Sequence, residues 1–388
     1  MAPHAGAGLH GTGEPESPGS ALEQFGPLLA AAATLLLFAL GEHAVEEAGF
    51  AGSLLALLVL FAVILWGAIG VMHHAERVAQ VLGEPIGTLV LTLSAITVEI
   101  ALIMSVMLVG KADPTLARDT MFAVLMIILN GLVGLALLLG GLRHRQQSYN
   151  LEGARSYLVV LIPLSVCALV LPDFTVSTAE PTLTFTQGLF FGFLALLLYG
   201  VFLALQTSRH RAFFAEAEAA EAGAEVAAAA APPVRRDMRA VWRHGALLLL
   251  TLVPVALLAH DMAEVLDTVA VAIDMPAALA GVIIAALILA PEGMAALRAA
   301  WANRLQRSVN ILLGSALSTI GMTVPAVLLA GYLTGQQIVL GLPQSSVVLL
   351  ALTLLVSTLT FGGARTDMLK GAVHVVLFGV YLLLVLMP

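Results

Sequence analysis

Long apolar runs separated by short polar segments fill most of the chain. A helix of about 20 apolar residues spans the hydrocarbon core of a bilayer, so eleven of these runs are candidates for membrane-crossing helices. Charged residues make up 11% of the 388 residues, whereas a soluble domain carries about 25%. The pattern predicts an all-α polytopic membrane protein surrounded by membrane lipid. Its predicted spans are 25–41, 50–72, 85–110, 118–140, 157–171, 186–207, 244–260, 276–298, 308–333, 345–362 and 370–387.

The polar segments divide the chain into parts. Residues 1–24 are rich in Gly, Pro and Ser and are predicted to form a disordered tail. Residues 25–49 hold the first membrane helix and an outer loop. Residues 208–243 are the one long polar stretch that follows, and their Ala/Glu-rich middle predicts a solvated acidic linker. The linker separates two five-helix units, residues 50–207 and residues 244–388.

The basic residues predict the orientation of the chain. If the N-terminus is cytoplasmic, 15 of the 17 Lys and Arg residues lie in cytoplasmic loops, and only Lys111 and Arg118 lie outside. Such an excess of positive charge marks the cytoplasmic side of a membrane protein. The linker is then cytoplasmic and the C-terminus external, in the inner (plasma) membrane of the cell. Because five is an odd number, the second unit is inverted relative to the first, which is the inverted-repeat plan of secondary transporters.

Each unit buries one carboxylate inside an otherwise uncharged apolar run. Glu99 lies in the run 87–110, and Glu292 lies in the run 277–297. A charge at this depth is expensive, so it marks an ion or proton pathway more often than a structural hydrogen bond. Because the arrangement occurs once in each unit, Glu99 and Glu292 are the main candidates for a site near the middle of the membrane.

Neutral oxygen atoms accompany the two glutamates. Thr92 shares a helical face with Glu99, because the two residues are about two turns apart. Pro291 has no N–H, so the carbonyl of Leu287 loses its helical hydrogen bond. Oxygen ligands of this kind bind Ca²⁺ and also serve Na⁺. The apolar runs that follow the glutamates add four candidates: Asn130, Ser315, Ser318 and Thr319.

Cations and protons should compete for such a site. Two facing carboxylates in a low dielectric cannot both stay ionised without a cation, so the empty site should take up protons. This competition is the physical basis of antiport, although a cation channel is a second class that fits the same residues. Three polar residues toward the ends of spans are secondary candidates: Glu76, His260 and Glu264. His260 and Glu264 lie near the outer mouth of the second unit, where an access path fits them, and Glu76 lies at a cytoplasmic helix end that we expect to be solvated.

The composition also argues against other functions. Cys167 is the single cysteine, so neither an intrachain disulfide nor a cysteine-based metal cluster can form. The chain has no His-Glu-x-x-His motif, so an intramembrane metalloprotease is disfavoured. Basic residues are sparse and confined to loops, which disfavours a nucleic-acid partner. We therefore expect neither an enzyme nor a bound cofactor.

Two stretches resemble the calcium/cation antiporter superfamily, specifically its cation–proton exchanger branch. They are LGEPIGTLVLTLSAITVEI at 82–100 and APEGMAALRAAWANRLQRSVNILLGSALSTIGMTVPAV at 290–327. In that family each repeat carries a Gly-Asn-Ala-x-Glu signature whose glutamate binds the cation, and these glutamates fall on Glu99 and Glu292. The Gly-Asn-Ala itself is replaced at 95–97 and at 288–290. The family's following Gly-Ser and amide positions fall on Asn130, Gly314, Ser315 and Ser318.

The resemblance implies an alternating-access antiporter that exports Ca²⁺ in exchange for H⁺, with small inorganic cations as its substrates. Two carboxylates match the double charge of Ca²⁺. The replaced Asn positions remove side-chain oxygens, which keeps exchange of Na⁺ or K⁺ for H⁺ as the alternative.

Overall fold

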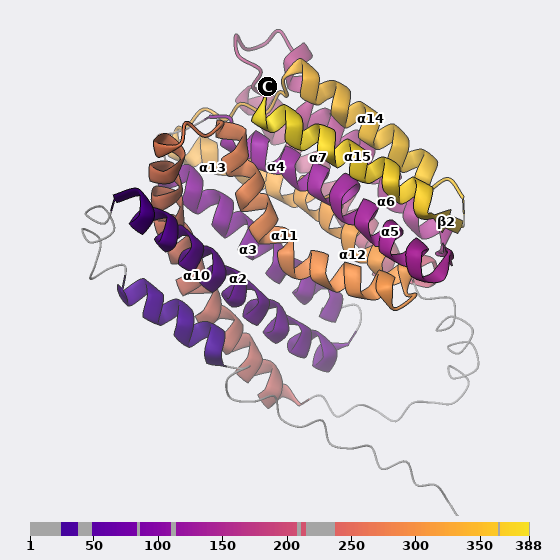
Figure 1. Cartoon of the computed structure of the whole chain (residues 1–388), viewed down its shortest axis with the longest axis horizontal. Helices are drawn as coiled ribbons and strands as arrows, with labels where there is room; N and C mark the ends of the chain where they lie inside the picture. Colours follow the sequence, from indigo (N-terminus) through magenta and orange to yellow (C-terminus); the bar gives the residue numbers. More distant parts are fainter. Residues whose placement is uncertain are drawn as a thin grey trace, which may run out of the picture.

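The computed structural model describes residues 25–37, 49–83, 86–109, 114–207, 211–214, 237–363 and 365–387. Most of these residues are helical, which confirms the predicted all-α membrane fold (Figure 1). In the described ranges, eight helices are long and apolar enough to cross a membrane, and three shorter apolar helices accompany them. The predicted tail at 1–24 lies outside the described residues.

The helices and strands follow one another in this order: a helix at Phe25–Leu37, α2 (Gly49–Leu82), α3 (Ile86–Val109), α4 (Leu116–Met126), η1 (Ile127–Leu132), α5 (Val133–His144), β1 (Gln146–Ser148), α6 (Leu151–Leu169), η2 (Leu171–Phe174), α7 (Phe185–Thr207), α8 (Arg211–Phe214), α10 (Met238–Ala272), α11 (Ala277–Trp301), α12 (Leu305–Ser318), η3 (Thr319–Thr323), α13 (Val324–Thr334), α14 (Gln344–Thr360), β2 (Arg365–Asp367) and α15 (Met368–Leu386). The elements η1 and η3 are π-helical, and η2 is a 3₁₀ helix.

Several helices extend beyond their apolar runs, because polar caps start them outside the hydrocarbon layer. The side chain of Asn150 accepts hydrogen bonds from the backbone N–H groups of Glu152 and Gly153, so α6 begins at Leu151 rather than near 157. Asp237 caps α10 in the same way. Residues 238–243, which we had assigned to the linker, therefore belong to α10.

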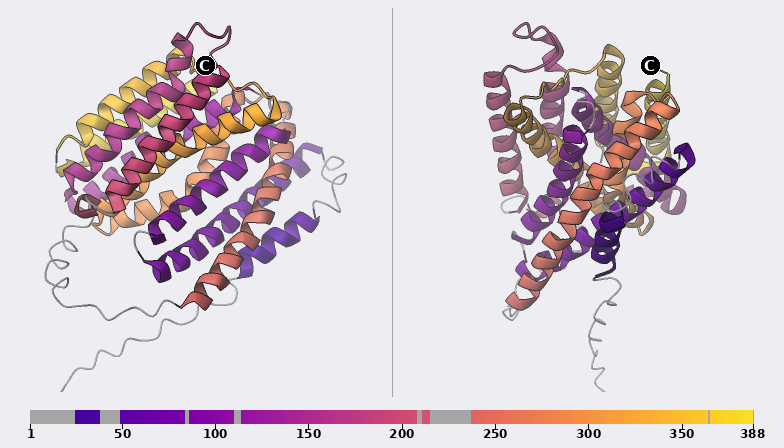
Figure 2. Two further views of the ribbon diagram at one scale, coloured as in Figure 1. Left: turned by 180° about the vertical axis from the view of Figure 1, so that it is seen from behind. Right: turned by 90° about the vertical axis from the view of Figure 1, so that its left-hand side faces the viewer.

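The two five-helix units interlock, because helices of one unit pack against helices of the other on both sides of the molecule. Helix α2 packs along α10 on one side, α5 packs against α15 on the opposite side, and α11 runs between the two pairs (Figures 1 and 2). The third span of each unit is interrupted by a π-helical turn at the corresponding place, η1 between α4 and α5 and η3 between α12 and α13. Such turns are frequent at functional sites.

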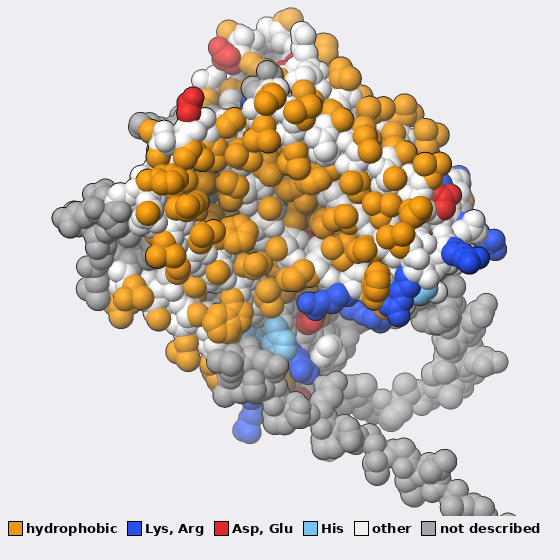
Figure 3. All heavy atoms as spheres, viewed as in Figure 1, with side chains coloured by type: hydrophobic (Ala, Val, Ile, Leu, Met, Phe, Trp, Pro, Cys, Tyr) orange, Lys and Arg blue, Asp and Glu red, His pale blue; other side chains and the backbone are white. Residues whose placement is uncertain are grey.

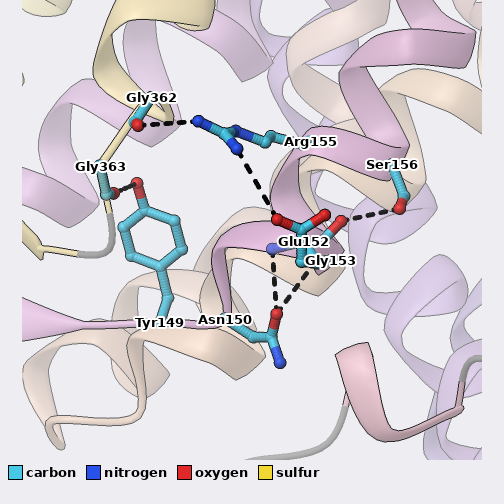
Figure 4. Close-up of polar contacts among 8 residues, drawn as sticks. All are labelled: Tyr149, Asn150, Glu152, Gly153, Arg155, Ser156, Gly362 and Gly363. Atoms are coloured by element: carbon cyan, nitrogen blue, oxygen red, sulfur yellow. Dashed lines mark hydrogen bonds and ion pairs between the residues drawn. The ribbon is translucent and has the colours of Figure 1, made fainter.

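A small β-pair ties the loops together on one face of the molecule. The strands β1 and β2 pair antiparallel and are the exception to the all-α class. Beside them, the Tyr149 hydroxyl donates to the carbonyl oxygen of Gly363, and Arg155 donates to that of Gly362 at 3.1 Å (Figure 4). Burial raises the pKa of Tyr149 to about 12, although Arg155 opposes the shift, so the hydroxyl keeps its proton at neutral pH.

The surface fits a membrane environment. Hydrophobic side chains cover a broad band of the face seen in Figure 3, as lipid contact requires. Lys and Arg side chains gather along one edge of this band. In Figure 4, Arg155, in the first turns of α6, reaches the loop at Gly362 that precedes β2.

Candidate functional site

The two buried glutamates lie on neighbouring helices, Glu99 on α3 and Glu292 on α11. Both side chains line one small cavity of about 20 Å³ in the interior of the helical bundle. Glu99 is only 5% exposed. The sequence pattern had placed one such carboxylate in each unit, and the fold brings the two together.

The helix that follows Glu292 supplies hydrogen-bond donors to both carboxylates. Ser315 donates to Oε2 of Glu292. Thr319, the first residue of the π-helical turn η3, donates to Oε2 of Glu99 at 3.1 Å. The hydroxyl of Ser318 donates to the carbonyl oxygen of Ser315 at 2.9 Å. One unit therefore holds the carboxylate of the other, which couples the two halves of the site.

One carboxylate oxygen of the two glutamates has no hydrogen-bond donor in the described part of the chain. Oε1 of Glu99 is buried and has no hydrogen-bond partner among the residues that the structure describes. A buried carboxylate oxygen without a donor is costly, because it loses water and gains nothing in return. The hydroxyl of Thr323, in the same turn as Thr319, is likewise buried without a hydrogen-bond partner among the described residues.

A larger cavity of about 370 Å³ shares six lining residues with the small one and extends away from it. Thr92 and Gly314 line it, as the sequence analysis expected. It reaches Glu76 near the end of α2, Gln206 at the end of α7 and Arg307 at the start of α12. These helix ends lie on the face that carries most of the basic residues, so the cavity leads from the glutamates to that face.

Close helix packing fills the opposite side. A Cβ placed on Gly281 of α11 would lie 3.0 Å from backbone atoms of Asp119 and Thr120, so α11 and α4 touch at the backbone. Arg118 donates to the carbonyl oxygen of Gly341 at 3.2 Å across the same end of the bundle. The helices therefore pack closely at this end of α11.

Asn130 does not line either cavity, although the sequence analysis grouped it with the glutamates. Its Nδ2 donates to Oγ1 of Thr353 at 2.8 Å, and its Oδ1 accepts from Nδ1 of His374 at 3.2 Å. Because Nδ1 carries the proton, Nε2 of His374 accepts from Thr360 at 2.9 Å. The amide is thus occupied by α14 and α15, and it is fully buried.

The remaining predicted residues lie in two different settings. Leu287 is completely buried, and α11 stays helical through Pro291, which lines both cavities. The side chains of His260 and Glu264 are about half exposed, and Nε2 of His260 lies 3.8 Å from Oε1 of Glu264. Neither of these two lines a cavity with the glutamates.

The cavity also contains residues that the sequence analysis missed. Tyr157 and Tyr199 form part of its wall, and Gln206, Arg307 and Asn310 lie toward its opening. Tyr199 had a usable signal, since it is the one hydroxyl-bearing residue in the apolar stretch 188–205. Tyr157 and Asn310 looked like ordinary residues of helix ends.

The site can bind a hard cation or protons through oxygen atoms alone. In the described ranges, no group of three or more His, Cys, Asp or Glu side chains comes together. The donors around the two carboxylates are hydroxyl groups, which can also offer lone pairs to an ion. Such an all-oxygen set suits Na⁺, K⁺ or Ca²⁺ rather than a soft metal.

Comparison with known proteins identifies the family. The family model described as sodium/calcium exchanger protein matches residues 52–208 and 244–387. The chain belongs to this family. The predicted resemblance to cation antiporters is thereby confirmed, and the exchanger is a membrane transporter rather than an enzyme.

Alignments with relatives cover most of this chain. The chain is 42% identical over 335 residues to the putative ionic transporter y4hA of Sinorhizobium fredii, and the alignment covers 86% of this chain and 89% of that one. It is 36% identical over 354 residues to the sodium-potassium/proton antiporter ChaA of Escherichia coli, covering 90% of this chain and 93% of ChaA. The solved structure of native YfkE superimposes with a TM-score of 0.71 at 17% identity, covering 93% of the exchanger and 100% of YfkE, which confirms the fold.

Proposed function

We propose that the protein is a cation/proton antiporter in which one site, formed by Glu99 and Glu292, binds either a cation or protons. The observation that carries this proposal is the shared cavity: Glu99 and Glu292, from opposite units, line the small cavity, and the larger cavity extends from it to residues near the ends of α2, α7 and α12. Access from one side at a time is what alternating access requires. We assign the open face to the cytoplasm, because the basic residues gather there.

We place Na⁺ and K⁺ ahead of Ca²⁺ as substrates. Ca²⁺ takes six to eight oxygen ligands, and the amide that would help to complete such a shell, that of Asn130, is bonded to Thr353 and His374. A monovalent cation together with one retained proton would neutralise the two carboxylates. ChaA, which is 36% identical, is named a sodium-potassium/proton antiporter.

Export of Ca²⁺ is the second candidate. It is favoured by one specific feature, the convergence of two carboxylates on one small cavity. Two negative charges match a divalent ion without a retained proton. The number of protons displaced by each cation therefore distinguishes the two candidates.

The test is transport by the purified full-length protein in liposomes that contain a pH-sensitive dye. Gradients of NaCl or KCl should drive protons in the opposite direction, CaCl₂ should act more weakly, and choline chloride should have no effect. The apparent Na⁺ affinity should rise by up to about tenfold per pH unit, because one proton is displaced. Proton movement with Ca²⁺ alone, at about twice that slope, would support the second candidate. Cation current without proton movement would mean a channel.

A further inference from the structure

Tyr199 of α7 lies in the wall of the cavity that holds Glu292. It is 4% exposed, and its ring packs against the turn η3, where a Cβ on Gly321 would lie 3.1 Å from it. The same turn carries Thr319, the donor to Glu99. Tyr199 therefore contacts the element that joins the two carboxylates.

The Tyr199 hydroxyl makes no hydrogen bond to any residue that the structure describes, which is unusual for a buried tyrosine. Three other tyrosines do have partners: Tyr149 donates to Gly363, Tyr157 accepts from Gln206 at 2.8 Å, and Tyr332 donates to Thr184 at 3.1 Å. Tyr381, which is also buried, has no hydrogen bond in the described part of the chain either, but it does not line the cavity with Glu292.

Tyr199 and the two glutamates therefore belong to connected cavities: Tyr199 and Glu292 line the larger one, and Glu99 and Glu292 line the smaller one. We propose that Tyr199 is a further functional residue of the cation site, whose hydroxyl donates a hydrogen bond to the ionised carboxylates. The inference rests on the proposed exchange of cations for protons at this site. Tyr199 lies outside the two glutamate stretches that resemble the family, because it comes from a different helix, α7.

The chemical consequence has a definite sign. A donor to an ionised carboxylate stabilises the charged form and makes the proton easier to remove. Tyr199 therefore keeps the site available to a cation at neutral pH. Without the hydroxyl, protons should be held more tightly and a cation should displace them less readily.

The matched variants are Tyr199→Phe and Tyr332→Phe. Each keeps the aromatic ring and removes one hydroxyl. The hydroxyl of Tyr332 donates to the carbonyl oxygen of Thr184, and Tyr332 does not line the cavity with Glu292. For the transport assay, the apparent Na⁺ affinity of Tyr199→Phe should fall about tenfold near neutral pH, equivalent to about one pH unit.

The pH dependence separates this role from a packing role. The affinity of Tyr199→Phe should approach that of the parent protein at alkaline pH, where protons no longer compete, and Tyr332→Phe should keep the parent's midpoint. An equal loss of affinity at every pH, or no change at all, would overturn the proposal.

A second measurement does not depend on transport. Infrared absorption of protonated carboxyl groups, followed against pH in detergent and assigned with Glu99→Gln and Glu292→Gln, reports the titration of the pair directly. Its midpoint should move to higher pH in Tyr199→Phe and stay in place in Tyr332→Phe. An unchanged midpoint in Tyr199→Phe would refute the role of Tyr199 even if the parent exchanges cations. A shifted midpoint in a protein that does not exchange cations would refute the antiporter alone.

Discussion

At the scale of single residues, the two glutamates are held in different ways. Oε2 of Glu292 accepts from Ser315 of the following helix, whereas Glu99 accepts from Thr319 of the other unit and keeps one oxygen without a hydrogen-bond partner among the described residues. The free oxygen is the position at which an incoming ion can gain most. The site is therefore asymmetric, although its two carboxylates occupy equivalent places in the two units.

Replacement of either carboxylate by an amide should stop exchange. Glu99→Gln and Glu292→Gln keep the side-chain volume and one carbonyl oxygen, but they can neither carry a proton nor balance the charge of a cation. We expect at least a hundredfold loss of cation-driven proton movement in liposomes. A change of one pKa unit alone would alter the apparent affinity about tenfold, and the amide removes both the titrating proton and the negative charge. The protein should still insert and elute as a folded species.

Glu264→Gln is the matched control for these variants. Its carboxylate is half exposed, lies beside His260 and does not line a cavity with the glutamates. Exchange should stay close to that of the parent. Loss of exchange in Glu264→Gln would restore the access role that the sequence analysis considered, and full activity in Glu99→Gln would make that carboxylate structural.

At the scale of elements, the two π-helical turns have taken different roles. The turn η3 presents Thr319 to Glu99, whereas η1 directs Asn130 toward α14 and α15. Equivalent turns therefore support a binding cavity in one unit and a packed helix interface in the other. Close backbone packing accompanies the interface, since a Cβ on Gly134 would lie 2.9 Å from the backbone nitrogen of Val375.

Asn130→Ala should consequently lower stability more than it changes cation affinity. The substitution removes the hydrogen-bond partner of His374 Nδ1, and a buried polar group left without a partner costs about 1–3 kcal/mol. Thermal unfolding in detergent should show the loss, while the apparent Na⁺ affinity at a temperature below the transition stays within about twofold. Ser315→Ala, which removes the donor to Glu292, should show the opposite pattern. If Asn130→Ala instead keeps its thermal stability and loses most of its Na⁺ affinity, Asn130 would be a ligand of the cation site.

At the scale of the whole molecule, the direction of the cavity depends on which face is cytoplasmic. Hydrophobic side chains cover the band between the faces, and basic side chains mark one edge (Figure 3). The cavity leads to the basic face through the ends of α2, α7 and α12. In the orientation predicted by the positive charges, the described state is inward-open.

Single cysteines in a Cys167→Ala background test that orientation. Val176, which is 98% exposed in the segment between α6 and α7, should be external, and Arg304, at the start of α12, should be cytoplasmic. A maleimide that cannot cross the membrane should label Val176→Cys in intact cells and Arg304→Cys only in inverted vesicles. Reversed labelling would invert the proposed orientation and place the cavity opening on the external side.

Much of this protein follows from the sequence alone, because hydrophobic length and buried charge are local properties. Runs of about 20 apolar residues must be helices in a bilayer, where every backbone polar group needs an internal partner. A lone carboxylate in such a run is conspicuous for the same reason, so Glu99 and Glu292 could be identified before the fold was known. Helix ends were less predictable, because polar caps such as Asn150 and Asp237 extend helices beyond their apolar runs.

The tertiary structure decided which polar groups meet. Thr319 reaches Glu99 across 220 positions of the chain, and Asn130 reaches Thr353 across 223. Helical periodicity describes only one helix at a time, so it could not tell that Asn130 is occupied by α14 and α15 while Tyr199 faces the cavity from α7. In a medium without water each polar side chain takes the partner that packing brings within reach. The composition of the site is therefore a property of how the two units interlock.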